Sequence, residues 1–298
     1  MGWPAASNSI REVELVRDPH FRRGFVVSAP EPGQHVVAGV VRADPRGRYP
    51  VWRLTQWSSR FPLTDFAPRP GPQDTLAIGN QAKLVRIGRP GTPYGDLTLA
   101  VRGRLEYGGC ARGPKDPWVH LLVDQEFVRE AWLSDLSALR LHLEVRVSQC
   151  RRARTAHYDP SIHAAQVPLF ISIQNRDPAS VGFGDYYHFG IPLFDNRQRM
   201  PTGLVAGDPG TGKLMYCPPA SKWTSASTHG GQWVTYSGDL LPEVLKGLQA
   251  AWERGFLPDS QQVNDYRPAG LCVGWEVPGV FDVSCQLRNV SLRAAVRR

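Results

Sequence analysis

Residues 239–254 read DLLPEVLKGLQAAWER, and residues 270–292 read GLCVGWEVPGVFDVSCQLRNVSL. The first stretch predicts a helix, because Asp239 can accept the free amide hydrogens at its start and Pro242 falls in the first turn, where no N–H is needed. Gly255 can close the far end. The apolar residues recur at spacings of three and four and form one face: Leu241, Val244, Leu245, Leu248, Ala251 and Trp252. We expect this helix to pack on a large apolar surface.

The second stretch and most of the remaining chain read as strands. Residues 139–147 (LRLHLEVRV) alternate in polarity, so that Leu141 and Leu143 face a core while Arg140, His142 and Glu144 face away from it. Clusters of Gly, Pro, Asn and Asp supply the turns. Further strands are expected at residues 97–106, 118–124, 167–173, 186–194, 212–216, 233–236, 271–275 and 281–292, and a second, weaker helix at residues 126–136. The pattern predicts an all-β, mostly antiparallel β-sandwich with little helix.

Composition points to one domain. The 298 residues are 42% hydrophobic and can bury a large core, and no linker, repeat or low-complexity tract divides them. The 29 glycines and 26 prolines suit many short strands and loops better than a helical bundle. We therefore expect a single domain over residues 1–298, with an irregular N-terminal extension over about residues 1–25.

The chain is basic, with a formal net charge of +8 and its densest arginine cluster at Arg151, Arg152 and Arg154. Such a charge attracts anions in general, but no nucleic-acid motif accompanies it, so we expect no nucleic-acid partner. No apolar run approaches the roughly 20 residues that span a bilayer, which excludes a membrane-spanning helix and predicts a soluble protein. Residues 1–20 contain no apolar secretory segment and give no localisation, and oligomeric state has no signature in the sequence.

The cysteines and one glycine-rich segment suggest no cofactor. Five cysteines without a C-x-x-C spacing favour buried, reduced thiols, with a Cys272–Cys285 pair on neighbouring strands as the alternative. Residues 207–213 (GDPGTGK) match the glycines and lysine of a phosphate-binding P-loop, but Leu214 stands where Ser or Thr is needed and two prolines soon follow. We expect a hairpin turn there and no nucleotide.

Residues 233–292 resemble the C-terminal part of glycoside hydrolase family 12, small endoglucanases with a concanavalin A-like jelly-roll fold. The shared features are Tyr-Ser-Gly-Asp at residues 236–239, Gly-Phe-Leu at residues 255–257, and a strand with Gly274, Glu276 and Gly279. The resemblance covers about one fifth of the chain. It implies a jelly roll with one main helix on its convex face, and a carbohydrate-active enzyme that cleaves a polysaccharide in a concave groove.

The resemblance also nominates site residues. In that family the Glu of the late Gly-x-Glu strand is the general acid/base, which implies this role for Glu276. The family's nucleophile strand begins approximately Asp-Tyr-Glu, and the nearest match is residues 184–188 (GDYYH), where Tyr187 stands in place of the Glu. This departure puts the family's retaining mechanism in doubt.

Hydrolysis nevertheless requires a second carboxylate. Glu144, on the polar face of its strand, is one candidate and Asp185 is the other. The alternatives are structural: Glu144 can pair with Arg140 or Arg146 on its own face, and Asp185 can be a turn residue. A carboxyl separation of about 5–5.5 Å would indicate retention of configuration, and roughly 6.5–9.5 Å inversion.

A polysaccharide lyase acting on uronate polymers is a second hypothesis. Such enzymes abstract a proton with Tyr or His after neutralising the uronate carboxyl. Tyr186 and His188 alternate onto one side of their strand and would be the catalytic pair. Substrate-binding candidates in strand-like contexts are His120, His142, Gln174 and Arg140, with Arg140 and His142 expected beside Tyr186 and His188.

A noncatalytic carbohydrate-binding or structural sandwich is the third hypothesis. Nine tryptophans can supply sugar-stacking platforms, among them Trp52 and Trp57 in loop-rich stretches. His120, His142 and His188 on three strands can be imagined as metal ligands, but no H-x-H or H-x-x-x-H spacing supports this, and no metal or other cofactor is predicted. In each hypothesis the partner is a polysaccharide or oligosaccharide.

Overall fold

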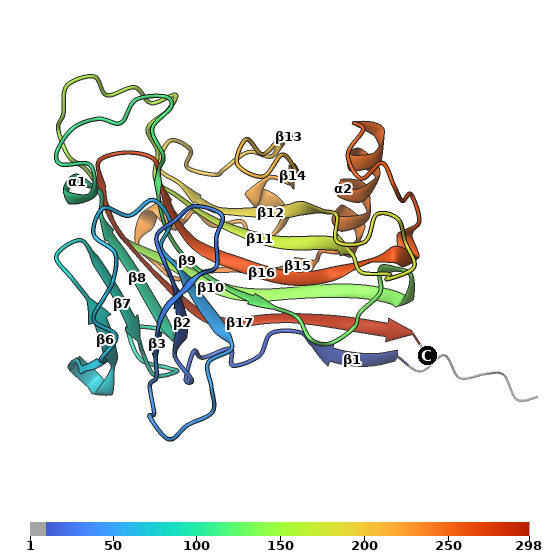
Figure 1. The fold of residues 1–298 in the computed structure, drawn as a ribbon, viewed down its shortest axis with the longest axis horizontal. Helices are drawn as coiled ribbons and strands as arrows, with labels where there is room; N and C mark the ends of the chain where they lie inside the picture. Colours follow the sequence, from blue (N-terminus) through green and yellow to red (C-terminus); the bar gives the residue numbers. More distant parts are fainter. Residues whose placement is uncertain (1–9, 298) are drawn as a thin grey trace, which may run out of the picture.

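The computed structural model describes residues 10–297, which form two facing β-sheets (Figure 1). The eight-stranded sheet contains, in spatial order, β15 (Val234–Asp239), β10 (Leu136–Arg152), β17 (Phe281–Arg297), β8 (Leu97–Arg102), β7 (Lys83–Ile87), β6 (Leu76–Gly79) and β5 (Arg69–Pro70), with β1 (Ile10–Glu14) also paired to β17. The nine-stranded sheet contains β13 (Leu204–Gly207), β14 (Leu214–Cys217), β12 (Tyr186–Asp195), β11 (Gln166–Asn175), β16 (Tyr266–Val277), β9 (Val119–Glu126), β4 (Trp52–Thr55), β2 (Phe25–Ser28) and β3 (Val37–Val41).

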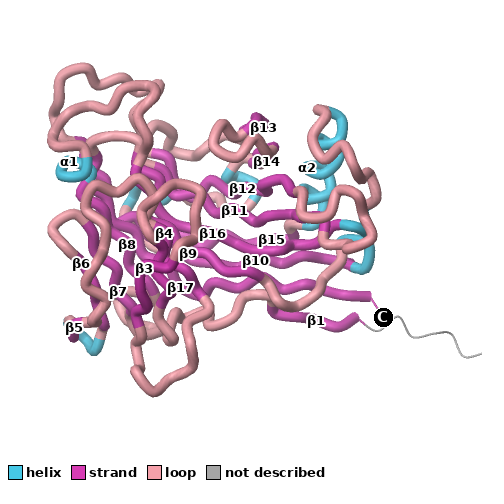
Figure 2. The backbone as a smooth tube through the Cα atoms, in the orientation of Figure 1, coloured by secondary structure: helices cyan, strands magenta, loops and turns pink. Residues whose placement is uncertain are grey.

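Nearly all pairings are antiparallel, and the parallel ones join β12 to β14 and β2 to β4. Helices are few and short (Figure 2). They are α1 (Gly103–Glu106), α2 (Leu241–Glu253) and the 3₁₀ turns Pro72–Asp74, Leu133–Asp135, Ala220–Lys222, Thr228–Gly230 and Val263–Asp265. The chain thus has the all-β, mostly antiparallel sandwich with one main helix that the sequence predicted.

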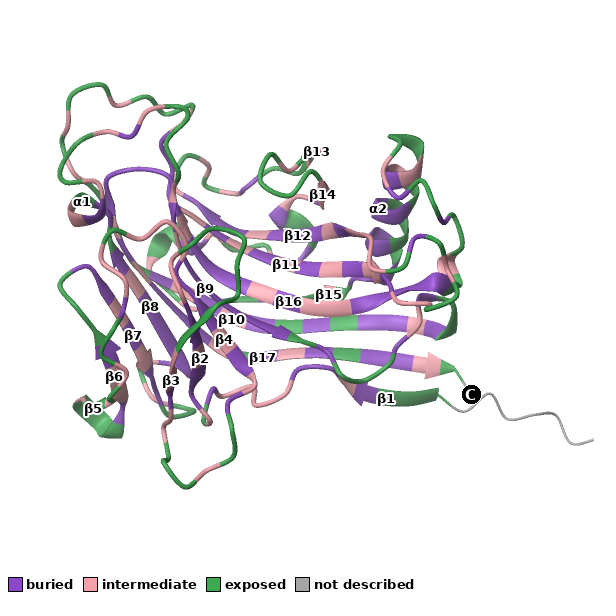
Figure 3. Ribbon diagram, viewed as in Figure 1, coloured by how far each residue is buried: buried purple, intermediate pink, exposed green. Residues whose placement is uncertain are grey.

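The core lies between the sheets because their strands alternate in polarity. Along β11, Val167, Leu169, Ile171 and Ile173 are fully buried while the residues between them are partly exposed. The same alternation appears as changing colours along β10, β11 and β16 in Figure 3. Each sheet therefore has an inner apolar face and an outer, more polar face.

Helix α2 matches the predicted helix closely. The Asp239 carboxylate accepts a hydrogen bond from Leu241 N at 3.1 Å, and Gly255 ends the helix with a φ of 78°. Val244 and Leu248 are fully buried against the inner side of β12 and β14 and the nearby β10. The helix therefore packs on the inner side of the nine-stranded sheet at one edge of the sandwich.

Three local predictions were wrong. Residues 126–136 are not a helix, because Phe127 N donates to Ala269 O and keeps the chain paired beside β16. The strand expected over residues 97–106 stops at Arg102 and turns into α1. The irregular extension expected over residues 1–25 contains β1 within its described part, while residues 1–9 lie outside the described residues.

The structure also shows where two of the cysteines and the glycine-rich segment of residues 207–213 lie. Cys272 lies on β16 and Cys285 on β17, in different sheets, so they are not neighbours on paired strands. Residues 207–213 form the turn of the antiparallel β13–β14 hairpin, as predicted. Over residues 10–297, no helix combines the length and apolar character needed to cross a bilayer.

Candidate active site

Glu276 lies on the outer face of the nine-stranded sheet. In the strand register it lies between His120 of β9 and Gln166 of β11. The residues on either side of it in the chain, Trp275 and Val277, are fully buried in the core. The alternation of β16 therefore turns the Glu276 carboxyl away from the core.

A glycine fixes the position of this carboxyl. Gly274 has a φ of 149°, and a Cβ atom there would lie 2.4 Å from the Leu121 carbonyl oxygen. A side chain at this position would therefore push β16 away from β9. The close approach of these strands holds Glu276 beside His120, which gives a physical reason for the Gly-x-Glu pattern.

The surroundings of Glu276 favour its protonated form. The Trp118 indole N–H lies close to its carboxyl, and His120 is its neighbour on β9. Burial raises the pKa of Glu276; His120 and Trp118 oppose this shift, and the charge of Asp208 adds to it. A carboxyl that keeps its proton nearer to neutral pH can act as a general acid.

Four aromatic side chains form a row on the side of Glu276 where His120 lies. The ring centres are 5.7 Å apart for His35 and Trp57, 5.8 Å for Trp57 and His120, and 5.7 Å for His120 and Trp118. Trp118 Nε1 and His120 Nδ1 are buried and have no hydrogen-bond partner within residues 10–297. Such a row offers stacking surfaces for sugar rings and free polar atoms for their hydroxyl groups. The sequence had singled out Trp57 and His120 but not Trp118.

Asp208 is a carboxylate near Glu276 that the sequence did not indicate. It lies in the β13–β14 turn, where its Oδ2 accepts from Thr211 Oγ1 at 2.6 Å and its Oδ1 from Gly210 N at 3.0 Å. Oδ2 is also 4.0 Å from His188 Nε2. The parallel pairing of β14 with β12 brings this turn to the site, and pairing between strands distant in sequence leaves no local pattern.

Tyr186 and His188 share the outer face of β12, as predicted. Their rings meet edge-on with centres 5.0 Å apart. Lys213 Nζ lies 5.5 Å from the centre of the Tyr186 ring and 2.5 Å from Asp185 Oδ1. Burial lowers the pKa of His188 and so favours its neutral imidazole, and burial raises the pKa of Tyr186.

Tyr187, which the sequence match placed at the nucleophile position, is not on this face. It is fully buried, and its hydroxyl donates to the Val244 carbonyl of α2 at 2.5 Å. From Tyr186 to Pro192, the outward positions of β12 are Tyr186, His188, Gly190 and Pro192. None of these is a carboxylate, so β12 offers no nucleophile of the family's kind.

Glu144 is far from Glu276 in the fold. It lies on the outer face of the eight-stranded sheet, where it accepts hydrogen bonds from Arg288 at 2.5 and 2.9 Å and from Asn289 at 2.7 Å. The predicted pairing of Glu144 with Glu276 is therefore not formed. Alternation assigns a residue to the outer side of a strand but does not say which sheet contains the strand.

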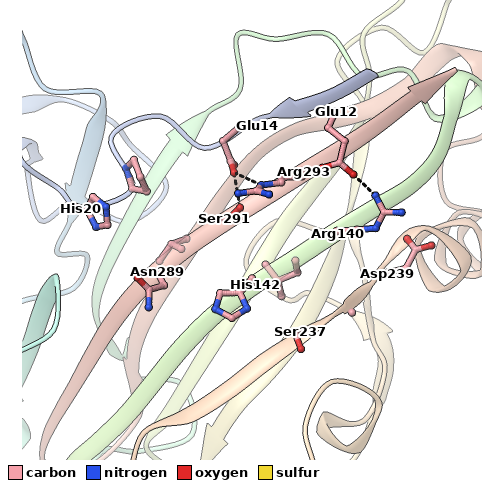
Figure 4. A pocket seen from close by; sticks show the side chains of 14 residues that line it. Glu12, Glu14, His20, Arg140, His142, Ser237, Asp239, Asn289, Ser291 and Arg293 are labelled. Carbon is pink, nitrogen blue, oxygen red and sulfur yellow. Dashed lines mark hydrogen bonds and ion pairs between the residues drawn. The ribbon is translucent and has the colours of Figure 1, made fainter. Parts of the chain in front are cut away.

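Arg140 and His142 lie on the same strand as Glu144, so their predicted position beside Tyr186 and His188 is wrong. They line a pocket of about 780 Å³ on the outer face of the eight-stranded sheet (Figure 4). Arg140 forms an ion pair there with Glu12. Because His142 is on this sheet, it cannot meet His120 and His188 at one metal ion. Over residues 10–297, no three His, Cys, Asp or Glu side chains are grouped to hold a metal.

The remaining predicted residues have structural partners. Trp52 is fully buried and its Nε1 donates to the Asp18 carbonyl at 2.9 Å, so the prediction that it contacts sugar is wrong. Gln174 does lie on the outer face of β11, where its amide donates to the Gly184 carbonyl. The Asp185 carboxylate is occupied by Lys213.

Comparison with known proteins gives structural but not sequence matches. No protein-family model and no curated protein sequence matches the chain. An endoglucanase from Rhodothermus marinus is similar in structure, with 11% identity, a TM-score of 0.39, and coverage of 78% of this chain and 96% of that chain. A metagenome-derived family 12 endoglucanase has 11% identity and a TM-score of 0.41, with coverage of 83% of this chain and 99% of that chain. A family 11 xylanase from Neocallimastix patriciarum has 6% identity and a TM-score of 0.34, with coverage of 79% of this chain and 97% of that chain.

The neighbours therefore include the family that the C-terminal fifth of the sequence resembles. These matches are similarities of structure, and the roles of individual residues are argued from the geometry of this chain.

Proposed function

We propose that this protein hydrolyses polysaccharide chains on the outer face of its nine-stranded sheet, with Glu276 as the general acid. The observation that carries the proposal is an outward carboxyl with a raised pKa beside buried polar atoms of Trp118 and His120 that have no partner of normal geometry within the described residues. An unsatisfied buried polar group is unfavourable unless a ligand completes it. Sugar hydroxyl groups and a glycosidic oxygen are ligands of this kind.

In the proposed reaction Glu276 gives its proton to the glycosidic oxygen as the bond from that oxygen to C1 breaks. The positive charge that develops at C1 requires a second carboxylate. Asp208 suits this role best, because its charge acts on Glu276, whereas Glu144 is on the other sheet and Asp185 is paired with a lysine. Asp208 would either attack C1 or take a proton from the attacking water, and the anomeric configuration of the first product distinguishes these two roles.

Elimination is a second candidate reaction, favoured by the group around Tyr186. A neutral His188 can take the C5 proton of a uronate, the C–H electrons form the C4–C5 double bond, and the bond to the leaving oxygen at C4 breaks. Tyr186, whose pKa is raised by burial, would protonate that oxygen, and Lys213 would balance the uronate charge. This reaction produces an unsaturated sugar that absorbs in the near ultraviolet.

A product screen tests these proposals directly. The protein is incubated with neutral β-glucan, with xylan and with polygalacturonate, while reducing ends and near-ultraviolet absorbance are followed together. Reducing ends without absorbance support hydrolysis, and absorbance from the uronate polymer supports elimination. Binding without any product contradicts both reactions and leaves a noncatalytic carbohydrate-binding protein.

Variants assign the chemistry to residues. Glu276→Gln should abolish hydrolysis and Glu144→Gln, the matched change on the other sheet, should preserve it. Under elimination, His188→Gln should abolish product formation while Glu276→Gln leaves it within a few-fold. Hydrolysis that continues in Glu276→Gln would overturn the role of Glu276.

A further inference from the structure

Two arginines meet at the far end of the outer face that carries Glu276. Arg267 lies on β16 directly opposite Gln174 of β11. Arg176 follows the end of β11, and its Nη1 donates to Gln174 Oε1 at 3.3 Å. Gln174 thus contacts Arg176 directly and is the cross-strand neighbour of Arg267, and the charge of Arg176 acts on Arg267.

Aromatic rings hold both arginine side chains in place. The Arg267 guanidinium lies 5.5 Å from the centre of the Trp132 ring, and its Nη1 donates to the Arg129 carbonyl at 3.3 Å. The Arg176 guanidinium lies 6.0 Å from the centre of the Phe183 ring. Side chains fixed in this way lose little conformational freedom when they bind a ligand.

The positive charges of this pair are only partly compensated, by the nearby charge of Glu130. Within residues 10–297, neither Arg176 nor Arg267 forms a salt bridge, and Arg267 Nε has no hydrogen-bond partner although the residue is only 8% exposed. Burial lowers the pKa of Arg267, Arg176 lowers it further, and Glu130 opposes the shift. Two like charges brought together in this way are stabilised when an anion binds between them.

We propose that Arg176, Arg267 and Gln174 form a subsite for the carboxylate of an acidic saccharide chain. The guanidinium groups would donate charge-assisted hydrogen bonds to the carboxylate oxygens, and the Gln174 side chain would help to orient Arg176. That the carboxylate belongs to a saccharide rests on the proposed function. The anion-binding property depends only on the arginines.

The position of the subsite implies a long substrate. Arg267 and Glu276 are nine residues apart on β16, which corresponds to about 30 Å of strand. A chain that reaches both groups must contain several sugar units. We therefore infer that the preferred substrate is a polymer with uronate units rather than a short neutral oligosaccharide.

The wild-type protein allows a test that does not depend on cleavage. The Arg267 Nε–Hε resonance is followed by NMR while galacturonate hexamer, cellohexaose or sodium sulfate is added. We expect the hexauronate and sulfate to shift this resonance in a salt-dependent manner, and cellohexaose not to shift it. Loss of the signal in an Arg267→Gln variant assigns the resonance. If that variant does not fold, the signal is assigned as the arginine resonance that Arg176→Gln shifts most, because the charge of Arg176 acts on Arg267.

Affinity measurements with variants complete the test. Arg176→Gln should weaken binding of the hexauronate at least tenfold, and Arg102→Gln, a charge-matched change on the outer face of the other sheet, should leave it unchanged. A shift with sulfate alone, or equal shifts with hexauronate and cellohexaose, would overturn the saccharide subsite. Because binding is measured directly, the subsite can be confirmed even if Glu276→Gln shows that the proposed hydrolysis is wrong.

Discussion

Glu144 and Glu276 occupy equivalent kinds of position in opposite sheets, and their environments differ completely. Each lies on the outer side of a long central strand. Burial acts to raise the pKa of Glu144, but hydrogen bonds from Arg288 and Asn289 outweigh it and the pKa falls. Burial raises the pKa of Glu276, and no such partners reverse the shift. One glutamate is held as a carboxylate, and the other is favoured as an acid.

The difference extends to the two outer faces. On the eight-stranded sheet, Glu14 accepts from the Ser291 hydroxyl and from Leu292 N, and Glu12 pairs with Arg140. On the nine-stranded sheet, Trp118 Nε1 and His188 Nδ1 are buried without partners in the described part of the chain. Paired acids stabilise a fold, whereas unsatisfied buried groups indicate a ligand. Unpartnered buried atoms also occur on the eight-stranded sheet, at Arg86 Nε and Gln286 Oε1, so it is the pairing of Glu12, Glu14 and Glu144 against Glu276, unpaired within the described residues, that distinguishes the two faces.

The largest expected effect is on catalysis. Replacing Glu276 by Gln removes the proton donor and should lower kcat by about 10²–10⁴-fold. Glu144→Gln should leave kcat within about twofold, because no substrate group reaches that face in the proposed reaction. Initial rates on the best substrate of the product screen measure both. Equal losses in the two variants would contradict the distinction between the faces.

Two tryptophans provide the next contrast. Trp118→Phe removes an unpartnered N–H beside Glu276 and should raise KM about tenfold with little change in Tm, as expected for one lost hydrogen bond of about 1.4 kcal/mol to substrate. Trp52→Phe removes a buried N–H that bonds to Asp18, so it should lower the unfolding free energy by about 1–3 kcal/mol without changing KM. Steady-state kinetics and urea unfolding check the two variants. A loss of stability in Trp118→Phe alone would place Trp118 among the structural residues.

The two glutamates should differ in the opposite sense in their effect on stability, and by less than they differ in catalysis. Glu144→Gln weakens charge-assisted hydrogen bonds at a site that is partly open to solvent, so we expect a loss of about 1 kcal/mol at pH 7. Glu276→Gln should be neutral or slightly stabilising, because it replaces a poorly solvated carboxyl with a neutral amide. Chemical unfolding of both variants at one pH measures this difference. A strong loss in Glu276→Gln would indicate a hidden structural partner.

The smallest effects concern pH. The folded pKa of Glu276 is above its unfolded value, so its contribution to stability is present below the ordinary Glu pKa and is lost as pH rises through the raised value. The folded pKa of Glu144 is below its unfolded value, so its contribution is present above the ordinary pKa and is lost as pH falls through the lowered value.

Urea midpoints of the wild type and both variants between about pH 3 and pH 8 test these two slopes. Glu276→Gln should flatten only the decline as pH rises, and Glu144→Gln only the decline as pH falls. If Glu276→Gln removed the loss of stability at low pH, or Glu144→Gln removed the loss at high pH, the direction assigned to that residue's pKa shift would be wrong. Hydrolysis by the wild type should also decline as pH rises through the raised pKa of Glu276, because the proton donor is lost.

Local patterns were sufficient wherever one strand or helix carries the information. The alternation of residues 139–147 predicted β10, and the spacing of Val244 and Leu248 predicted the buried side of α2. Patterns failed where a neighbour decides the outcome. Residues 126–136 have apolar side chains at helical spacing, yet Phe127 pairs with the Ala269 backbone, and only Leu133–Asp135 form a 3₁₀ turn. The sequence did not predict the short N-terminal strands β2 to β7, because each has too few residues to establish a period.

The sequence by itself determined the fold class, the main helix and the outward direction of Glu276, because these follow from polarity that repeats along one segment. Only the tertiary structure decided which outward residues share a face. It separated Glu144, Arg140 and His142 from Glu276, and it brought Asp208 and His188 together from distant segments. The physical reason is that side-chain alternation has a period of two residues within a strand, whereas the order of strands in a sheet is set by pairing between segments far apart in the chain.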